Sequence, residues 1–174
     1  MTPSIVSATE LKPQEQQPLR LDDLLALDAG RLHRLYCEAK VPSLQSLSGD
    51  LRGRVLTPVV LSPAWNAFMV TWSGTNWFPW RGKSFSPVSE SDGRGINRVF
   101  GARMYPFETF IGPSRAGDFD AVQLNYDLPE NPIFLRPTKD EIRELSPGLY
   151  LGQAYVALKK GDKFVLYFAL TSIQ

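Results

Sequence analysis

The amino-acid sequence predicts one mainly β domain, an antiparallel β-barrel that follows a short N-terminal helical segment. After residue 43, short segments with strand-like alternation follow one another at regular intervals, separated by turns rich in Gly, Pro, Asn and Asp. No long helix lies between the later segments to form parallel crossovers. Segments 149–158 and 163–171 predict a hairpin that is apolar on both faces. A closed barrel, whose inner face is lined and whose outer face is covered, explains that double apolarity.

The chain divides into three parts. Residues 1–19 carry three prolines and a Gln-Glu-Gln-Gln run, a composition typical of a flexible tail. Residues 20–42 show apolar side chains at helical spacing on both sides of Gly30, and Pro42 ends the pattern, so we expect two short helices. Two such helices are too small to form a domain. We therefore expect them to pack on, or plug, a barrel formed by residues 43–174.

Within the barrel region the patterns predict individual elements. Pro63 suits the first turn of a helix, and the apolar residues that follow it share one helix face, so we expect a helix over 63–72. The segment Gly93-Arg94-Gly95 is too short for a dinucleotide-binding motif and is interpreted as a hairpin turn. The expected strands are 51–57, 80–85, 96–104, 107–111, 121–126, 133–136, 141–145, 149–158 and 163–171.

Composition narrows the classes of function. The 19 basic residues nearly match the 18 acidic ones, and a net charge of +1 argues against a general nucleic-acid or membrane-surface binder. One cysteine, Cys37, excludes an intramolecular disulfide and a multi-cysteine metal site. No signal-peptide pattern and no apolar run of membrane-spanning length is present. We expect a cytoplasmic protein with no cofactor, no metal, no nucleic-acid partner and no membrane span, and the sequence leaves its oligomeric state open.

Few residues offer a nucleophile beside a base. His33 is the only histidine, and Cys37 lies four residues later, so the two could share a helix face. The simpler interpretation is a small buried cysteine and an exposed or half-buried histidine, and we prefer it. A charged group lies at 140–144, where alternation puts Glu141 and Arg143 on one face and Asp140 on the other. Such a group is either a solvated ion-pair face or an Arg–carboxylate pair inside the barrel that orients a ligand.

Aromatic and basic residues suggest a cavity wall. All four tryptophans fall within 65–80, where they form either core or an aromatic wall for a flat apolar ligand. Arginines 52, 54, 98 and 103 lie at expected strand positions, so some of them must face solvent or a wet cavity.

The segment Phe78-Pro-Trp-Arg-Gly-Lys-Ser-Phe85 resembles the Trp-x-Gly-Lys-x-Phe strand of bacterial lipocalin-like proteins of the Gly-x-Trp-x-Gly type, although Phe78 stands where that motif has glycine. Blocks at 95–98, 125–132, 140–143 and 147–152 are similar to those of uncharacterised lipocalin-like proteins. The resemblance covers about residues 45–172. It implies a calycin-type barrel with an internal ligand cavity, and it implies no particular ligand or reaction.

Three hypotheses about function follow. The first is binding of a small apolar or amphipathic molecule, such as a fatty acid, isoprenoid or polyketide, inside the barrel. Its expected ligand-binding residues are Trp77, Trp80, Lys83, Arg98, Tyr126, Arg136 and Tyr167. The alternative is a cofactor-independent cyclase, isomerase or hydrolase, with catalytic candidates Tyr126, Asp140, Glu141, Arg143, Tyr150 and Tyr155. The third is a scaffold that binds a partner through residues 21–40. Whether the protein is an enzyme stays open at this point, and so do the ligand and the pathway.

Overall fold

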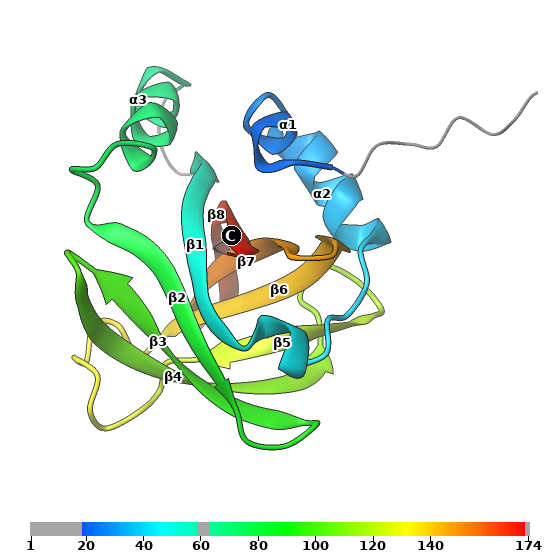
Figure 1. Ribbon diagram of the computed structural model, residues 1–174, viewed down its shortest axis with the longest axis vertical. Coiled ribbons are helices and arrows are strands. Elements are labelled where there is room, and N and C mark those ends of the chain that lie inside the picture. Colours follow the sequence, from blue (N-terminus) through cyan, green and yellow to red (C-terminus); the bar gives the residue numbers. More distant parts are fainter. Residues whose placement is uncertain (1–18, 59–62, 173–174) are drawn as a thin grey trace, which may run out of the picture.

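Eight antiparallel strands close into one barrel in the computed structural model, which describes residues 19–58 and 63–172 (Figure 1). Each strand pairs with its neighbour in the sequence, and β8 returns to pair with β1. The strands are β1 (Gly49–Pro58), β2 (Trp80–Pro87), β3 (Asp92–Val99), β4 (Ala102–Pro113), β5 (Asp120–Asn125), β6 (Thr138–Ser146), β7 (Leu149–Leu158) and β8 (Gly161–Ser172). The helices are α1 (Leu21–Leu25), α2 (Ala29–Glu38), the 3-10 helix η1 (Gln45–Leu47) and α3 (Pro63–Ser73). The predicted fold class is confirmed.

Strand alternation fills the barrel interior with large apolar side chains. Phe85, Phe107 and Phe168 are buried there. Two glycines make room for these rings. A Cβ atom on Gly95 would lie 2.3 Å from the Phe107 ring, and one on Gly152 would lie 2.2 Å from the Phe168 ring. Any larger residue at either position would have to displace an aromatic side chain from the core.

The two ends of the barrel differ. At one end η1 covers the core, because Leu44 and Leu47 are buried in it and the Tyr150 hydroxyl donates to the Ser46 carbonyl oxygen at 2.8 Å. The other end carries the β1–β2, β3–β4, β5–β6 and β7–β8 connections, since consecutive antiparallel strands turn at alternating ends. In Figure 1, α3 stands beside the end of β1 at this second end. We call the first the closed end and the second the mouth end.

Helices α1 and α2 lie on the outer wall of the barrel. Leu24, Leu32 and Tyr36 are fully buried and form a second apolar cluster with Leu151 and Ala169 of β7 and β8. This cluster explains why the β7–β8 hairpin is apolar on both faces. The expected tail lies almost wholly in residues 1–18, outside the described residues. No helix among the described residues is long and apolar enough to cross a bilayer.

Three local predictions were wrong. The expected strand 96–104 is interrupted by the β3–β4 turn at Phe100 and Gly101, which have φ angles of 50° and 81°. Gly93-Arg94-Gly95 belongs to β3, and the β2–β3 turn lies before it, where the Val88 and Ser89 amides donate to the Asp92 carbonyl oxygen. Residues 133–136 form turns, in which the Leu135 and Arg136 backbone N–H groups donate hydrogen bonds to the Pro132 carbonyl oxygen, and make no strand.

Candidate functional site

A buried lysine is the least ordinary feature of the barrel interior. Lys83 lies on the inward face of β2, and only 3% of its surface is exposed. Its Nζ donates to Asp140 Oδ2 at 2.9 Å, to Asn97 Oδ1 at 3.0 Å and to the Tyr126 hydroxyl. A charge buried in an apolar interior is strongly disfavoured unless it is paired and hydrogen-bonded. These three acceptors, from three different strands or their ends, provide that pairing.

The same acceptors are joined to one another. The Tyr126 hydroxyl donates to Asp140 Oδ2 at 3.1 Å and accepts from Asn97 Nδ2 at 3.1 Å. Asn97 Oδ1 also accepts from the Trp80 indole nitrogen at 3.0 Å. Trp80, Lys83, Asn97, Tyr126 and Asp140 therefore form one connected network, which we call the Lys83 network.

Four aromatic rings surround the Lys83 ammonium group. The distances from Nζ to the ring centroids are 5.5 Å for Trp80, 5.2 Å for Phe107, 5.2 Å for Tyr126 and 5.3 Å for Phe168. All four are within the range in which a ring quadrupole attracts a cation. The rings exclude water from the ammonium while they stabilise its charge.

Burial shifts the acid–base properties of the network. Desolvation lowers the pKa of Lys83, and the neighbouring Asp140 carboxylate opposes that shift. Desolvation and the Asp140 charge raise the pKa of Tyr126 well above its usual value. The Tyr126 hydroxyl therefore keeps its proton at neutral pH, whereas the Lys83 ammonium releases its proton more readily than an exposed lysine would.

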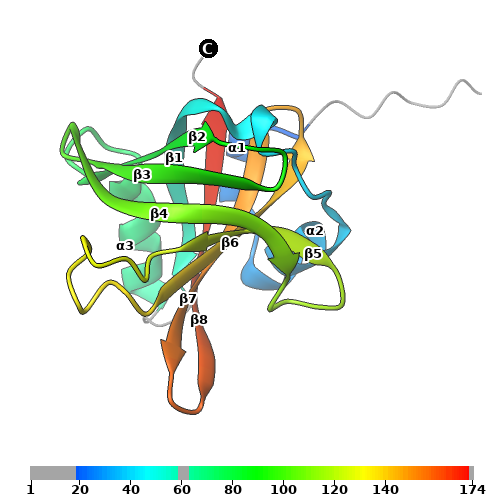
Figure 2. The ribbon, with the colours of Figure 1, turned by 90° about the horizontal axis from the view of Figure 1, so that it is seen from below.

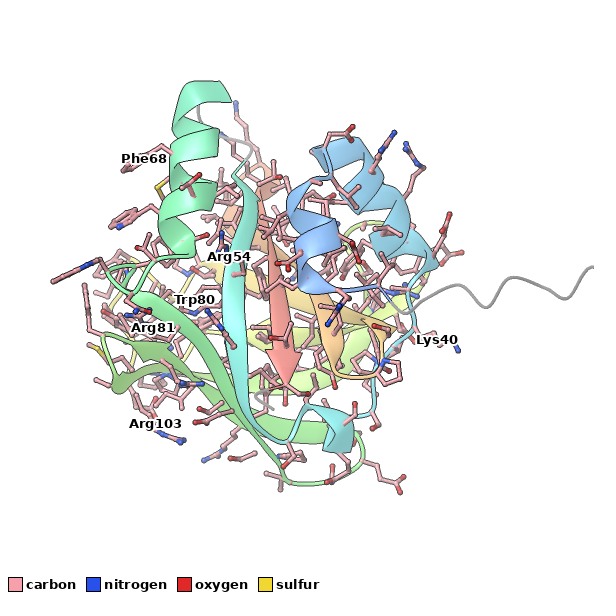
Figure 3. The ribbon with its side chains drawn as sticks, turned by 45° about the horizontal axis from the view of Figure 1, so that its top comes forward. Lys40, Arg54, Phe68, Trp80, Arg81 and Arg103 are labelled. Atoms are coloured by element: carbon pink, nitrogen blue, oxygen red, sulfur yellow. The ribbon has the colours of Figure 1, made fainter. Side chains whose placement is uncertain are left out.

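An apolar cavity of about 260 Å³ ends on this network. Trp80 projects from β2 toward β1, as Figure 3 shows, and its ring packs against Gly53. Asp140 lines the cavity with Lys83, and its second carboxylate oxygen, Oδ1, is buried and has no hydrogen-bond partner. The apolar wall consists of Val55, Phe78, Trp80, Ala154, Leu166 and Phe168. An apolar space with polar groups gathered at one point is the usual form of a small-molecule site.

The charged residues of segment 140–144 lie on two different faces of the barrel wall in the structure. The expected alternation is present, because Asp140 faces the interior while Glu141 and Arg143 face outward, beneath the β4–β5 connection and α2. Glu141 is fully buried there and accepts from Ser114 Oγ at 2.8 Å and from the Arg115 amide at 3.0 Å. The Arg143 guanidinium lies 4.1 Å from the Phe119 ring centroid. The interior partner of Asp140 is thus a lysine and no arginine.

The predicted tyrosines outside the Lys83 network have structural contacts. Tyr150 lies inside the barrel at the closed end, bonded to Ser46. Tyr155 and Tyr167 lie on the outer wall, where both hydroxyls contact Gln153. Burial raises the pKa of Tyr150, and burial likewise raises the pKa of Tyr167 to about 12.

The other predicted ligand-binding residues lie at the surface. Trp77 is 84% exposed in the connection from α3 to β2. Arg98 lies on the outer wall, 3.8 Å from Asp50, and Arg136 donates to main-chain carbonyls of its own loop. Of all the residues singled out from the sequence, the structure brings four together in the Lys83 network, and all of them except Tyr126 line the cavity: Trp80, Lys83, Tyr126 and Asp140.

The pair His33 and Cys37 shares one face of α2, with 3.7 Å between Nε2 and Sγ. His33 Nδ1 lies 3.3 Å from the Tyr167 hydroxyl on the outer wall, away from the cavity. Among the described residues no group of three or more His, Cys, Asp or Glu side chains could hold a metal ion.

Asn97 and Phe168 belong to the site and were not among the predicted residues. Alternation along 164–170 had already placed Phe168 on a face with apolar neighbours, which was the available signal. Asn97 lies in the block 95–98 that resembles lipocalin-like proteins, but that resemblance assigns it no role. Its role becomes visible only when β3 is paired with β2, where it lies directly opposite Lys83.

Comparisons with known proteins support the fold alone. No model of a known protein family matches the chain, and no curated protein matches it significantly. A crystal structure of a protein from Thermomonospora curvata is similar, with a TM-score of 0.52, over 85% of this chain and 89% of that one. The two sequences are 16% identical, so the likeness shows a shared barrel architecture and nothing about ligand or activity.

Proposed function

We propose that this chain binds a small apolar or amphipathic molecule inside its barrel, at the cavity that ends on Lys83 and Asp140. The observation that carries the proposal is the combination of an apolar wall with a buried polar network whose Asp140 Oδ1 lacks a partner. Buried polar groups are rarely left unpaired in a core that serves packing alone. An eight-stranded barrel is also just wide enough to hold one small ligand.

The lipocalin-like resemblance of residues 78–85 is part of this proposal. That segment contributes Trp80 and Lys83, which both line the cavity. The barrel topology and the similar crystal structure agree with a calycin-type architecture, and the motif supports the lipocalin-like assignment within it.

The decisive experiment fills the cavity. Ala154 lines it from β7, so Ala154→Phe should abolish binding of an apolar fluorescent probe, while Ala157→Phe on the opposite face of the same strand should leave it unchanged. Native mass spectrometry of the protein purified from its own host should show a co-purifying small molecule in the wild type and none in Ala154→Phe. Equal probe binding by both variants would refute the assignment of the site.

A second function, catalysis without a cofactor, is favoured by one observation. Tyr126 bonds to Lys83 and Asp140, the two polar residues that line the cavity, and burial lowers the pKa of this lysine, so a proton donor and a proton acceptor lie side by side. A turnover assay on a bound carbonyl compound should then lose activity in Tyr126→Phe. A rate unchanged in that variant would leave ligand binding as the function.

A further inference from the structure

The hydrogen bonds of the Lys83 network can be counted completely. The Lys83 ammonium has three donors, and all three are used, by Asp140, Asn97 and the Tyr126 hydroxyl. Both amide hydrogens of Asn97 are used as well, by Tyr126 and by the Tyr105 carbonyl oxygen. No donor in the network is left over for a ligand.

The unfilled position is an acceptor. Asp140 Oδ2 accepts two hydrogen bonds, whereas Oδ1 is buried and accepts none. A buried carboxylate oxygen without a donor is costly, and a ligand that supplies the donor recovers that cost once the Asp140 side chain turns this shielded oxygen toward the cavity that the residue lines. We propose that the ligand of this cavity is a neutral alcohol or phenol whose hydroxyl donates to Asp140 Oδ1. This inference rests on the proposed function, and it names the chemical class of its ligand.

Other head groups fit the network less well. A carboxylate would bring a second negative charge beside Asp140 and would find every donor already engaged. An aldehyde or ketone offers only an acceptor. An ammonium head could donate, but the site already holds Lys83, so a second cation would be buried next to the first. A hydroxyl supplies the missing donor without adding charge.

The cavity also limits the size of the ligand. An apolar cavity of about 150 Å³ accommodates benzene, so about 260 Å³ accommodates roughly ten non-hydrogen atoms. The wall of Trp80, Phe78 and Phe168 suits an aliphatic chain or a flat ring. Medium-chain alcohols, ten-carbon isoprenoid alcohols and naphthols are within this range.

The test compares head groups on one skeleton. Isothermal titration calorimetry with 1-nonanol, nonanal and nonanoate keeps the chain length constant while the head changes from donor to acceptor to anion. We expect 1-nonanol to bind at least tenfold more tightly than nonanal, the ratio expected for one hydrogen bond to a charged acceptor. Nonanoate should bind more weakly still. Equal or tighter binding of nonanal or nonanoate overturns the alcohol assignment but leaves the binding function standing; no binding of any of the three overturns both.

A substitution at Asp140 tests whether the preference for an alcohol over an aldehyde depends on Oδ1. Asp140→Asn exchanges one carboxylate oxygen for an amide group and should reduce the alcohol-over-aldehyde ratio to within about twofold. Asp118→Asn makes the same exchange on the exposed β4–β5 connection and should keep the wild-type ratio. If Asp140→Asn does not fold, the comparison of head groups in the wild type still decides. A folded Asp140→Asn protein with an unchanged ratio refutes the role of Oδ1.

A separate observation concerns the mouth end. We compare the described connections at each end together with two flanking strand residues: 57–58, 63–81, 98–103, 124–139 and 157–162 at the mouth end, and 43–50, 86–93, 112–121 and 145–150 at the closed end. The mouth-end segments contain seven basic residues, Arg81, Arg98, Arg103, Arg136, Lys139, Lys159 and Lys160, and three acidic ones, Asp127, Glu130 and Asp162. The closed-end segments contain one basic residue, Arg115, and five acidic ones, Asp50, Glu90, Asp92, Asp118 and Asp120.

Exposed apolar side chains are also concentrated at the mouth end. Trp77, Phe100, Ile133 and Phe134 are each between 77% and 84% exposed, and all belong to mouth-end connections. Among the described closed-end segments only Val88 is an exposed large apolar residue. In Figure 2 the β3–β4 turn and the β5–β6 connection lie on the same side of the barrel. We call these four residues the apolar rim.

We infer that the mouth end docks on an anionic lipid surface through the apolar rim and the basic residues around it. Aromatic and aliphatic side chains on separate loops, surrounded by Lys and Arg, match an interface of acyl chains and acidic headgroups. The rim side chains lie on three different connections, so each can enter a soft lipid layer independently. The ion pairs Asp50–Arg98, Asp50–Arg103 and Arg115–Asp162 join residues counted at opposite ends. They do not remove the polarity, since Arg81, Lys159 and Lys160 make no ion pair among the described residues.

Vesicle sedimentation tests the inference. The wild type should sediment with mixed phosphatidylcholine–phosphatidylglycerol vesicles and much less with pure phosphatidylcholine, and salt should weaken binding. Trp77→Ser with Phe134→Ser should reduce binding several-fold, and each of Lys159→Gln and Lys160→Gln about fivefold. Val88→Ser, at the closed end, is the matched control and should bind like the wild type.

Three results would overturn the docking surface. The first is absence of binding to anionic vesicles. The second is equal loss of binding in Val88→Ser and in the rim variant. The third is a dimer in solution that Trp77→Ser with Phe134→Ser converts to a monomer, because the apolar rim would then contact a second copy of the chain.

Discussion

Replacement of Lys83 by methionine should destabilise the protein strongly, because it removes the one cation that pairs with Asp140 among the described residues and leaves a carboxylate in an apolar interior. Asp140 is 5% exposed, and without Lys83 the Tyr126 hydroxyl is the one side-chain donor left to it within the described part of the chain. Breaking a buried pair by removing one partner costs about 3–5 kcal/mol. For a chain of 174 residues this corresponds to a fall in Tm of roughly 6–20 °C.

The double variant separates the charge effect from loss of packing. Lys83→Met with Asp140→Leu removes both charges and keeps similar shapes, so it should lie within about 2 kcal/mol of the wild type. The two single changes would then be coupled by at least about 2 kcal/mol in a double-mutant cycle. Urea unfolding followed by tryptophan fluorescence measures all four corners of the cycle.

An exposed lysine supplies the control. Lys163→Met, on the outer part of the β7–β8 hairpin, should change the free energy of unfolding by no more than about 0.5 kcal/mol. A cost below about 1 kcal/mol for Lys83→Met, or a double variant that costs the sum of the singles, would refute the view that Lys83 and Asp140 form a mutually dependent buried ion pair.

Three further outcomes are expected. Glu141→Gln should cost about 1.5–3 kcal/mol and speed amide hydrogen exchange across 113–119, because Glu141 holds that connection through Ser114 and Arg115; unchanged exchange would contradict this. Gly152→Ala should cost about 1–3 kcal/mol in urea unfolding, since its methyl group would meet the Phe168 ring, whereas Gly30→Ala in α2 should be neutral or stabilising by up to about 1 kcal/mol. Stability should fall above about pH 10: five buried tyrosines, Tyr36, Tyr126, Tyr150, Tyr155 and Tyr167, have a raised pKa, so they ionise in the unfolded chain first and each removes up to about 1.4 kcal/mol per pH unit. The lowered pKa of Lys83 acts in the opposite direction but is a single group, so urea midpoints that stay level through pH 10 would contradict the expectation.

The barrel could be predicted because its strands are separated by turns, and turn residues are favoured by local sequence preferences. The β7–β8 hairpin illustrates this, since the polar run Lys159-Lys160-Gly161-Asp162 separates two long alternating segments, and its two lysines form the turn. The β3–β4 turn could not be recognised in the same way. Its first residue is Phe100 with a positive φ, a conformation that aromatic side chains rarely adopt, so propensity predicts a continuous strand there. Hydrogen bonding between the neighbouring strands β3 and β4 stabilises this turn, although the local sequence does not favour it.

The glycines of β3 misled the prediction for a related reason. Gly93 and Gly95 look like turn residues when only neighbours in the sequence are considered. In the structure Gly95 is required by a ring on the next strand, because Phe107 occupies the space above it. Glycine can thus signal close approach of a distant side chain as well as a turn, and only strand pairing distinguishes the two.

Most of the Lys83 network could be predicted from the sequence, because alternation determines which residues share a face before the strand pairing is known. It placed Asp140 and Glu141 on opposite faces correctly, and the Trp80–Lys83 segment was singled out by its resemblance to a known strand. What alternation does not contain is which inward residues from different strands meet. Arg143 lies on the outer wall with Glu141, the residue whose face it was predicted to share, and the partner of Asp140 is Lys83, 57 positions away.

The net charge of the chain does not show how the charged residues are distributed over its surface. A sum of +1 argues against surface electrostatics only if the two signs are mixed over the surface. Antiparallel connectivity sends alternate connections to opposite ends, so any bias between odd and even connections becomes a bias between the two ends of the barrel. In this chain the β2–β3 and β4–β5 connections at the closed end are acidic, whereas Lys159 and Lys160 lie in the β7–β8 connection at the mouth end. The charge difference between the two ends of the barrel can therefore be predicted from the sequence only when the order of the strands is known.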